Sequence, residues 1–179
     1  MTTIDCFVPC QDAVSALELS KQFAGCPLAS HVYFLSTIDF NSGTNANVLQ
    51  VNTIAGTETL RIIASKVQSE YVMLSVKNTA LELGQFALDR LTRIACDTGA
   101  AMVYSDYYRI INGVRSLHPV NDYQEGSLRD DFNFGTIWLI PAASFKKAVE
   151  EMDVSYQYAG FYDLRLRLSQ HGELVHINE

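Results

Sequence analysis

Two polar residues, Ser75 and Lys77, follow a short apolar run, Tyr71–Leu74, that is typical of a buried strand. Residues just beyond the carboxyl ends of parallel strands share one edge of a sheet, where ligands bind. A lysine ammonium there can pair with phosphate oxygens and stabilise a departing anion without a metal ion. The alternative for Lys77 is a solvated lysine that begins a loop.

Other polar residues follow the neighbouring predicted strands. Pro9 and Asp12 come after the first strand, Ile4–Val8, and Ser36 follows the second strand, His31–Leu35. Asp12 is also a suitable N-cap for the helix that follows it. We expect Pro9, Asp12, Ser36, Ser75 and Lys77 to line a single cleft.

Two further residues are candidates for the same cleft. Arg61, near the start of a helix capped by Thr57, is either a phosphate contact or a surface arginine. Asp106, in a predicted strand region Ala101–Ile111, is expected to make a structural hydrogen bond or to contact a ribose.

Strands and helices alternate through the first half of the chain, without strict period-two polarity in the strands. This pattern predicts an α/β fold with a mostly parallel sheet covered by helices on both faces. The strands are Ile4–Val8, His31–Leu35, Asn47–Val51 and Tyr71–Leu74, and the helices run to about Phe23, from Thr57, and from about Leu81 to Cys96.

The second half, from about residue 101 to 179, has a mixed character. Asn112–Gly113 is a strong hairpin signal because both turn positions need positive φ, and it separates Ala101–Ile111 from Val114–Leu117. The other predicted elements are a strand Thr136–Ile140, a helix from Pro141 to Met152, a helix Asp163–Ser169 and a strand Leu174–Ile177. We predict a single domain, 1–179, in which a parallel, nucleotide-binding type of half at about 1–100 is joined to a mixed half at about 101–179.

Composition excludes several classes of function. With 179 residues and a formal charge of −7, the chain has no basic cluster for a nucleic-acid backbone. It contains neither a long apolar run nor a charged leader with an apolar segment, so we expect no transmembrane segment and a cytoplasmic location. The four cysteines match no zinc or disulfide pattern, and we expect reduced thiols. A nucleophilic Cys10 is the alternative, and it would need a histidine partner.

Four segments, in order, resemble the GT-A fold of the family 2 glycosyltransferases, which transfer a sugar from a nucleotide diphosphate sugar. The opening strand ends in Val8-Pro9, and Thr59-Leu60-Arg61 stands where the family has a helix start. Phe132–Phe145 resembles the acceptor-side loop, strand and helix. Asp163–Leu168, followed by His171-Gly172, resembles the family's Asp-Leu-x-x-Arg-Leu segment.

The chain also departs from this family at the positions where the family has its nucleoside-binding, metal-binding and catalytic residues. Ser36 stands where an aspartate holds the nucleoside, and Ser75 and Lys77 occupy the Asp-x-Asp positions that hold a divalent cation against the diphosphate. Gly160-Phe161 replaces the Glu-Asp pair that supplies the catalytic base. We therefore expect no cofactor and no metal ligand, with a divalent metal as the alternative although its usual aspartates are absent.

Inverting transfer needs a carboxylate that removes a proton from the acceptor hydroxyl. Asp163, Asp130 and Asp131 are the candidates, and the alternatives are a helix cap for Asp163 and solvated side chains for the other two. The resemblance places the acceptor near Asn133, and Arg129 lies just before that segment. Tyr158 and Tyr162 flank a small Ala159-Gly160 turn, where they are candidates for an acceptor pocket, and the alternative for them is core packing.

The first hypothesis is therefore a glycosyltransferase that uses a nucleotide diphosphate sugar, with UDP-sugars favoured, and a glycan or lipid-linked acceptor. The alternative is a catalytically silent GT-A-like module that binds a nucleotide sugar or glycan, or that serves as an interaction module in a longer protein. A nucleotidyltransferase ranks lower, because no glycine-rich and basic loop follows the first strand. Related enzymes often continue further, so we expect this chain to be an N-terminal part of a longer protein, whose remaining parts would supply any contact with the inner membrane.

Overall fold

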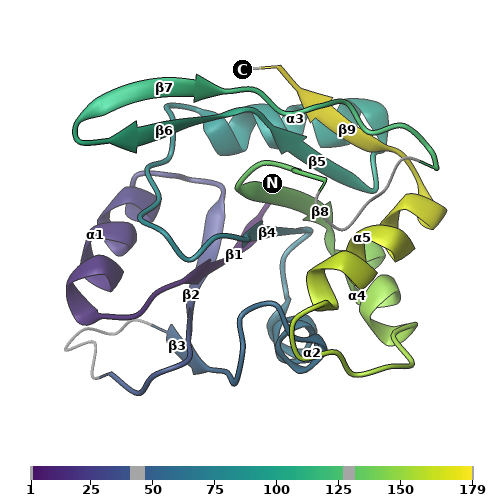
Figure 1. Cartoon of the computed structure of the whole chain (residues 1–179), viewed down its shortest axis with the longest axis horizontal. Coiled ribbons are helices and arrows are strands. Elements are labelled where there is room, and N and C mark those ends of the chain that lie inside the picture. The colour runs from purple at the N-terminus through teal and green to yellow at the C-terminus, as the bar shows by residue number, and fades with distance from the viewer. Residues whose placement is uncertain (1, 41–46, 127–131, 179) are drawn as a thin grey trace.

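The computed structural model describes residues 2–40, 47–126 and 132–178, and it is built around one sheet (Figure 1). This seven-stranded sheet has the order β3-β2-β1-β4-β8-β5-β9, and a separate hairpin consists of β6 and β7. Strands from both predicted halves join the same sheet. Strands β3, β2, β1 and β4 are parallel, as are β5 and β9, whereas β8 runs antiparallel to both of its neighbours, β4 and β5.

The elements of the first half largely match the sequence prediction. They are β1 (Ile4–Pro9), α1 (Ala13–Ala24), β2 (Ala29–Ser36), β3 (Asn47–Gln50), α2 (Thr57–Lys66), β4 (Tyr71–Ser75) and α3 (Ala87–Thr98). Asp12 caps α1, as predicted, and its Oδ1 accepts a hydrogen bond from the Ser15 amide at 2.9 Å.

Two helix starts differ from the prediction. Helix α3 begins at Ala87 rather than Leu81, because the side-chain amide of Gln22 binds the Leu81 carbonyl and the Leu83 amide, each at 3.1 Å, so these backbone groups are held by α1. Helix α2 is capped by Gly56, not Thr57, and the Thr57 hydroxyl accepts a hydrogen bond from the Tyr156 amide instead.

The second half contains the predicted hairpin and the remaining elements. These are β5 (Met102–Ser105), β6 (Tyr107–Ile111), β7 (Val114–His118), β8 (Ile137–Pro141), α4 (Ala142–Glu150), α5 (Gly160–His171) and β9 (Leu174–Ile177). Asn112 and Gly113 both have positive φ, as the turn requires. The predicted strand region Ala101–Ile111 divides at Asp106, where the chain leaves the main sheet.

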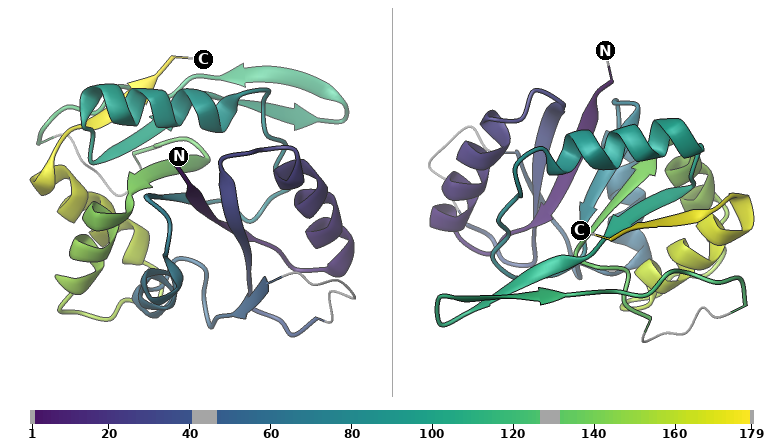
Figure 2. Two further views of the ribbon diagram at one scale, coloured as in Figure 1. Left: turned by 180° about the vertical axis from the view of Figure 1, so that it is seen from behind. Right: turned by 90° about the horizontal axis from the view of Figure 1, so that it is seen from above.

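Alternate residues of the strands enter two apolar layers, one on each face of the sheet. Helices α1 and α3 cover one face through side chains such as Phe23 and Leu91. Helices α2, α4 and α5 cover the other face through Ile63, Phe145 and Leu168. Figure 2 shows these two helix layers from behind and from above. Among the described residues, no helix is long and apolar enough to cross a membrane.

A buried carboxylate, Asp5, fastens three elements at the amino-terminal edge of the sheet. Its Oδ2 accepts hydrogen bonds from the amides of Gln68 and Ser69 at 2.6 and 2.9 Å, and its Oδ1 accepts one from the Ser69 hydroxyl at 2.7 Å. His31 Nδ1 lies 2.8 Å from Oδ1. Burial alone would raise the pKa of Asp5, but these hydrogen bonds to the carboxylate outweigh it and hold the pKa below its ordinary value.

Replacing Asp5 by Asn should lower the free energy of unfolding by about 2–3 kcal/mol at pH 7, because charged acceptors make the stronger hydrogen bonds. Since the folded-state pKa of Asp5 is depressed, this stabilisation is present above the unfolded-state pKa and is lost as pH falls through the folded-state value. Urea unfolding of wild type and Asp5→Asn should therefore differ at pH 7, and the difference should shrink as the pH falls below about 4. Asp12→Asn is the matched control, since asparagine caps a helix as well as aspartate. An equal effect of both variants would contradict the anchoring role.

Candidate functional site

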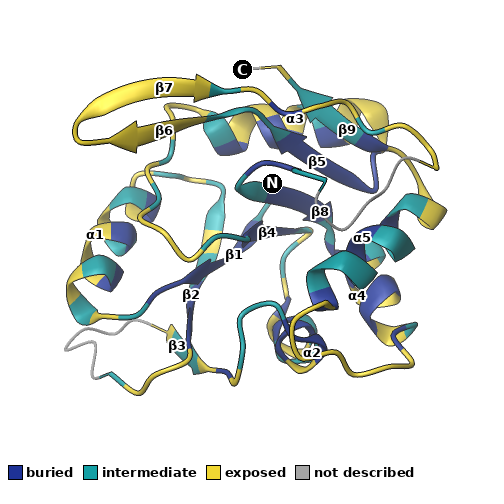
Figure 3. Cartoon of the chain, viewed as in Figure 1, coloured by how far each residue is buried: buried dark blue, intermediate teal, exposed yellow. Residues whose placement is uncertain are grey.

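The carboxyl ends of β1, β2, β4 and β5 meet at one edge of the sheet, and the start of β8 lies at the same edge because β8 is reversed. The strands leading to this edge are largely buried, whereas the hairpin beyond β5 is exposed (Figure 3). Polar residues that follow these strand ends are therefore brought together from both halves of the chain.

Lys77 is held at this edge by a neutral partner, the phenol of Tyr107. Lys77 Nζ donates a hydrogen bond to the Tyr107 hydroxyl at 3.1 Å and lies 4.7 Å from the centre of its ring. Within the described ranges, no carboxylate forms an ion pair with Lys77. The ammonium charge is therefore positioned at the edge, and no acidic side chain in the described part of the chain pairs with it.

Asn133, a predicted acceptor residue, joins this group through His118. The rings of Tyr107 and His118 lie 4.6 Å apart, and the Asn133 amide nitrogen is 3.3 Å from His118 Nε2. Asn133 Oδ1 accepts a hydrogen bond from the Gly135 amide at 3.0 Å, which fixes the side chain. Lys77, Tyr107, His118 and Asn133 form what we call the edge cluster, with contributions from the end of β4, from β6 and β7, and from the segment before β8.

Asp106 lies beside the edge cluster in a second polar group. Its Oδ1 accepts a hydrogen bond from the Val120 amide at 2.8 Å and lies 2.8 Å from His176 Nε2. His176 Nδ1 is 2.7 Å from Asp122 Oδ1. Asp106 therefore makes the structural hydrogen bonds expected as one of its two roles, and it ties the loop after β7 to the end of β9.

The residues after β1 and β2 are engaged by their own loops. Pro9 is the buried last residue of β1, and the Asp12 carboxylate caps α1. The Ser36 side chain is fully buried, and its hydroxyl donates to the Ile38 carbonyl at 2.7 Å and accepts from the Ile38 amide. Ser75 is the buried last residue of β4, directly opposite Ile137. The Asp12 carboxylate and the Ser36 hydroxyl are thus engaged in hydrogen bonds within their own loops.

Arg61 faces the helices rather than the edge cluster. Its guanidinium pairs with Glu58 on α2 and donates to the Met152 carbonyl at 2.9 Å. This arrangement links α2 to the end of α4.

The residues predicted for the base and the acceptor lie mostly around α5. Asp163, in the first turn of α5, accepts hydrogen bonds from Arg167 Nε at 3.2 and 3.3 Å, and it does not cap the helix. Tyr158 is 73% exposed, and the Tyr162 ring lies 5.6 Å from the guanidinium carbon of Arg165. The remaining candidates, Arg129, Asp130 and Asp131, lie outside the described residues.

Gly160 occupies a position where no side chain fits. A Cβ atom there would lie 2.7 Å from the Ala55 carbonyl oxygen and 2.8 Å from backbone atoms of Gly56 and Thr57. The next residue, Phe161, packs its ring against Trp138 at 5.5 Å. The start of α5 therefore carries no carboxylate at these two positions and is closely packed on the start of α2.

No described group of three or more His, Cys, Asp or Glu side chains has an arrangement suited to a metal ion. At the end of β4, a serine hydroxyl and an ammonium group are a poor match for a divalent cation, which prefers carboxylate oxygens and is repelled by positive charge. Burial raises the pKa of the Cys10 thiol, and Cys10 Sγ donates to the Asp12 carbonyl at 3.2 Å, which disfavours a reactive thiolate.

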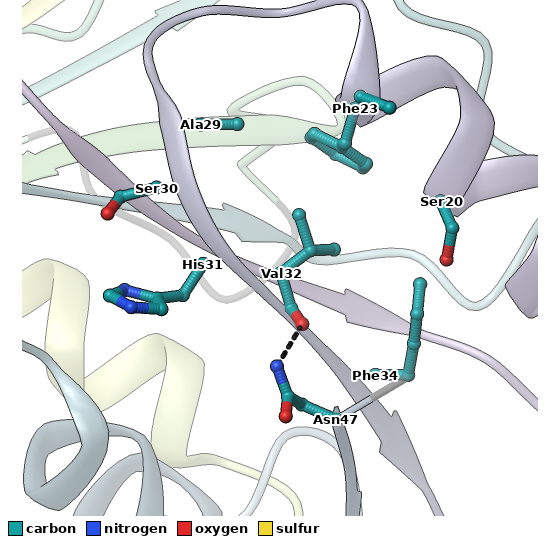
Figure 4. Close-up of a pocket in the computed structure, with 9 residues that line it drawn as sticks. Ser20, Phe23, Ala29, Ser30, His31, Val32, Phe34 and Asn47 are labelled. Atoms are coloured by element: carbon teal, nitrogen blue, oxygen red, sulfur yellow. Dashed lines mark hydrogen bonds between the residues drawn. The ribbon is translucent and has the colours of Figure 1, made fainter. Parts of the chain in front are cut away.

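A hollow of about 270 Å³ lies at the opposite edge of the sheet, between the end of α1 and the start of β2 (Figure 4). Its polar lining consists of Ser20, Ser30, His31 and Asn47, and Asn47 donates to the Val32 carbonyl. Because it lies at the amino-terminal ends of the strands, it is remote from the edge cluster.

Tyr107 and His118 were missed in the sequence analysis, although the hairpin signal contained them. Counting outward from Asn112–Gly113 pairs Tyr107 with His118, and this is the observed register. The contact between His176 and Asp106 joins residues 70 positions apart, and no local pattern marks it.

The contact with Lys77 should be visible in the ionisation of Tyr107. Burial raises the pKa of this phenol, but hydrogen bonds with Lys77 and Asn133 and the positive charges of Lys77 and Arg109 outweigh it, so the pKa lies below its ordinary value. Absorbance titration at alkaline pH should show an early tyrosine transition that disappears in Tyr107→Phe and moves to higher pH in Lys77→Met. Tyr104, whose pKa burial raises to about 12, is the internal control. An unchanged early transition in Tyr107→Phe would contradict this assignment.

No protein-family model and no curated protein sequence matches the chain. Solved structures match over nearly its whole length. Glucosyl-3-phosphoglycerate synthase from Mycobacterium tuberculosis, in complex with Mn²⁺, UDP and glucosyl-3-phosphoglycerate, is 12% identical, with a TM-score of 0.58 over 99% of this chain and 70% of that one.

Two cytidylyl-transferring enzymes match similarly. The 2-C-methyl-D-erythritol 4-phosphate cytidylyltransferase of Thermus thermophilus is 10% identical, with a TM-score of 0.57 over 99% of this chain and 89% of that one. The CMP:2-keto-3-deoxy-manno-octonic acid synthetase complexed with CTP is 8% identical, with a TM-score of 0.56 over 99% and 91%. The chain therefore shares the α/β fold of these solved structures, with a mostly parallel central sheet and flanking helices.

Proposed function

We propose that the chain binds a nucleotide diphosphate sugar at the carboxyl edge of the sheet and acts as a glycosyltransferase of the family 2 type. The observation that carries this proposal is the position of Lys77. Its ammonium group stands at the end of β4, oriented by the Tyr107 phenol and without an acidic partner among the described side chains. In this proposal Lys77 pairs with the diphosphate in place of a divalent cation.

Two features support a phosphate-facing role for Lys77. A neutral hydrogen-bond acceptor orients the ammonium but leaves its charge available, whereas a carboxylate would compete with phosphate for it. The strand end is also the place where ligands bind in open α/β sheets. A UDP-sugar is the favoured donor, and the bound UDP of the glucosyl-3-phosphoglycerate synthase is consistent with this choice.

Glycosyl transfer is favoured over nucleotidyl transfer by the loop after β1. Only Cys10, Gln11 and Asp12 separate β1 from α1, and the Asp12 carboxylate caps the helix. A triphosphate substrate is usually cradled by glycine backbone amides and basic side chains, which this short, acidic connection lacks.

The proposed acceptor, a glycan or a lipid-linked sugar, would approach from the side of Asn133. This residue is already in contact with His118 of the edge cluster. Asp163, Asp130 and Asp131 stay as the candidates for the base that deprotonates the acceptor hydroxyl. Arg129, Tyr158 and Tyr162 stay as candidate acceptor contacts.

The second candidate function is a silent module that binds a nucleotide sugar or glycan without transferring it. Gly160 favours this alternative, because the backbone of Ala55 and Gly56 excludes any side chain at the position where the resemblance places the catalytic glutamate. Transfer then requires a base from elsewhere, such as Asp163, whose carboxylate is paired with Arg167.

Donor binding can be measured by calorimetric titration with UDP- and GDP-sugars, in Mg²⁺ or Mn²⁺ and again in EDTA. Lys77→Ala should weaken binding of the preferred donor roughly 10- to 100-fold, the loss expected for one hydrogen bond to a charged group. Lys21→Ala, which removes an exposed lysine from the last turn of α1 at the opposite edge, should have no effect. Binding that disappears in EDTA would refute the substitution of lysine for the metal.

Turnover separates the two candidate functions. A transferase should release the nucleotide diphosphate from the bound donor when acceptor sugars are added, and Asp163→Asn should lower this rate about 10²- to 10⁴-fold if Asp163 is the base. Asp153→Asn, which changes an exposed carboxylate in the loop before α5, is the control. Donor binding without any release under all acceptor conditions would favour the silent module.

A further inference from the structure

The β6–β7 hairpin is an arm with an unusual concentration of exposed apolar side chains. It pairs with no third strand among the described residues, and it stands apart from the helix layers in the right-hand view of Figure 2. Its large apolar residues are between 47% and 67% exposed, and they are Tyr108, Ile110, Ile111, Val114 and Leu117. Solvated apolar groups gathered at one place mark a surface that contacts something else.

These side chains lie on both faces of the arm. Ile111 is opposite Val114 on one face, and Tyr108 is opposite Leu117 on the other face, which also carries Ile110. A protein partner that docks on a ribbon usually covers one face and leaves the other polar. A tip with apolar side chains on both faces can bury all of them only in an apolar medium that surrounds it, such as a lipid bilayer.

The charged residues of the arm lie directly behind its apolar tip. Ile111 and Val114 flank the turn, and Arg115 and Arg109 come one and two positions behind them. Residues 107–121 contain these two arginines and no Asp or Glu, although the chain has a net charge of −7. Apolar residues at the tip with arginines directly behind them match the layering of acyl chains and lipid phosphates in an anionic bilayer.

We propose that the tip of the β6–β7 arm inserts into the interfacial region of an anionic phospholipid bilayer. Ile110, Ile111 and Val114 enter the boundary of the acyl chains, and Arg109 and Arg115 bind lipid phosphates. Arg115 is already placed over the Tyr108 ring, 3.9 Å from its centre, so the cation and the aromatic ring reach the interface together. The acidic remainder of the chain is repelled by the same surface, which orients the molecule with its arm toward the lipid.

The arm begins at the edge cluster, because Tyr107 and His118 form its innermost pair. Ile111 is four positions beyond Tyr107 along β6, which corresponds to about 13 Å of strand. The cluster would thus face the membrane at a short distance, although lipid binding itself does not depend on the proposed donor chemistry.

Vesicle co-sedimentation tests the proposal with phosphatidylcholine vesicles that contain either about 30 mol% or no phosphatidylglycerol. The wild-type chain should bind the anionic vesicles more tightly, and added salt should weaken binding. The Ile111→Asp/Val114→Asp double variant should lose at least about tenfold in affinity, and each of Arg109→Gln and Arg115→Gln should lose about fivefold. Val14→Asp alters an apolar side chain on α1 that is 68% exposed, and it should bind as wild type does.

The altered side chains are exposed in the folded chain, so circular dichroism and urea midpoints should be unchanged. Equal binding by the double variant and wild type, or no binding of wild type to anionic vesicles, overturns the proposal. A dimer without vesicles that the double variant abolishes would also overturn it and assign the arm to a second copy. Donor binding is measured by calorimetry in the absence of vesicles. Failure of the membrane proposal is therefore distinguishable from failure of the proposed donor binding.

Discussion

The reversed direction of β8 is the constraint on which the rest of the molecule depends. This strand lies between β4 and β5 and runs antiparallel to both, so the segment that enters it reaches the edge where β4 and β5 end. Gly135 makes this entry possible. Its φ of 72° favours glycine, and a Cβ atom would lie 2.4 Å from the Ser105 carbonyl oxygen. The close approach brings Asn133 to the end of β5 and beside the arm that begins there.

One consequence is that the candidate site belongs to neither half of the chain alone. Lys77 follows β4 in the first half, and Tyr107, His118 and Asn133 come from the second. Just beyond them, Asp106 and His176 join the end of β5 to β9 and hold the loop after β7 through Val120. A network of this kind fixes the polar edge by side-chain contacts between elements, whereas Asp5 fastens the opposite edge through backbone amides of the α2–β4 loop.

Local patterns predict the parts of the structure that depend on local forces. The short apolar strands, the Asp12 cap and the Asn112–Gly113 turn are confirmed because neighbouring residues determine them. Helix α3 starts later than its apolar spacing suggests, since Gln22, about 60 positions away in the sequence, captures the intervening backbone. The position of Lys77 at a strand end followed from the sequence, but its partner Tyr107 depends on hairpin register and on the direction of β8. Ser36 shows why a residue at a strand end cannot be assigned to a ligand site from the sequence alone. Its hydroxyl binds the Ile38 backbone of its own turn instead of pointing to a ligand.

The choice of serine at position 75 and lysine at position 77 is physically linked when both are considered together with Tyr107. An aspartate at position 75 would place a carboxylate beside the ammonium of Lys77, and an aspartate at position 77 would remove the ammonium. In both cases no free positive charge would face a phosphate. Serine at 75 avoids this, and the phenol of Tyr107 supplies a neutral acceptor that orients Nζ. A single ammonium nevertheless carries half the charge of a divalent cation, so it neutralises only part of a diphosphate. The Asp106 carboxylate, which lies beside the edge cluster, is engaged by His176 and the Val120 amide rather than by Lys77.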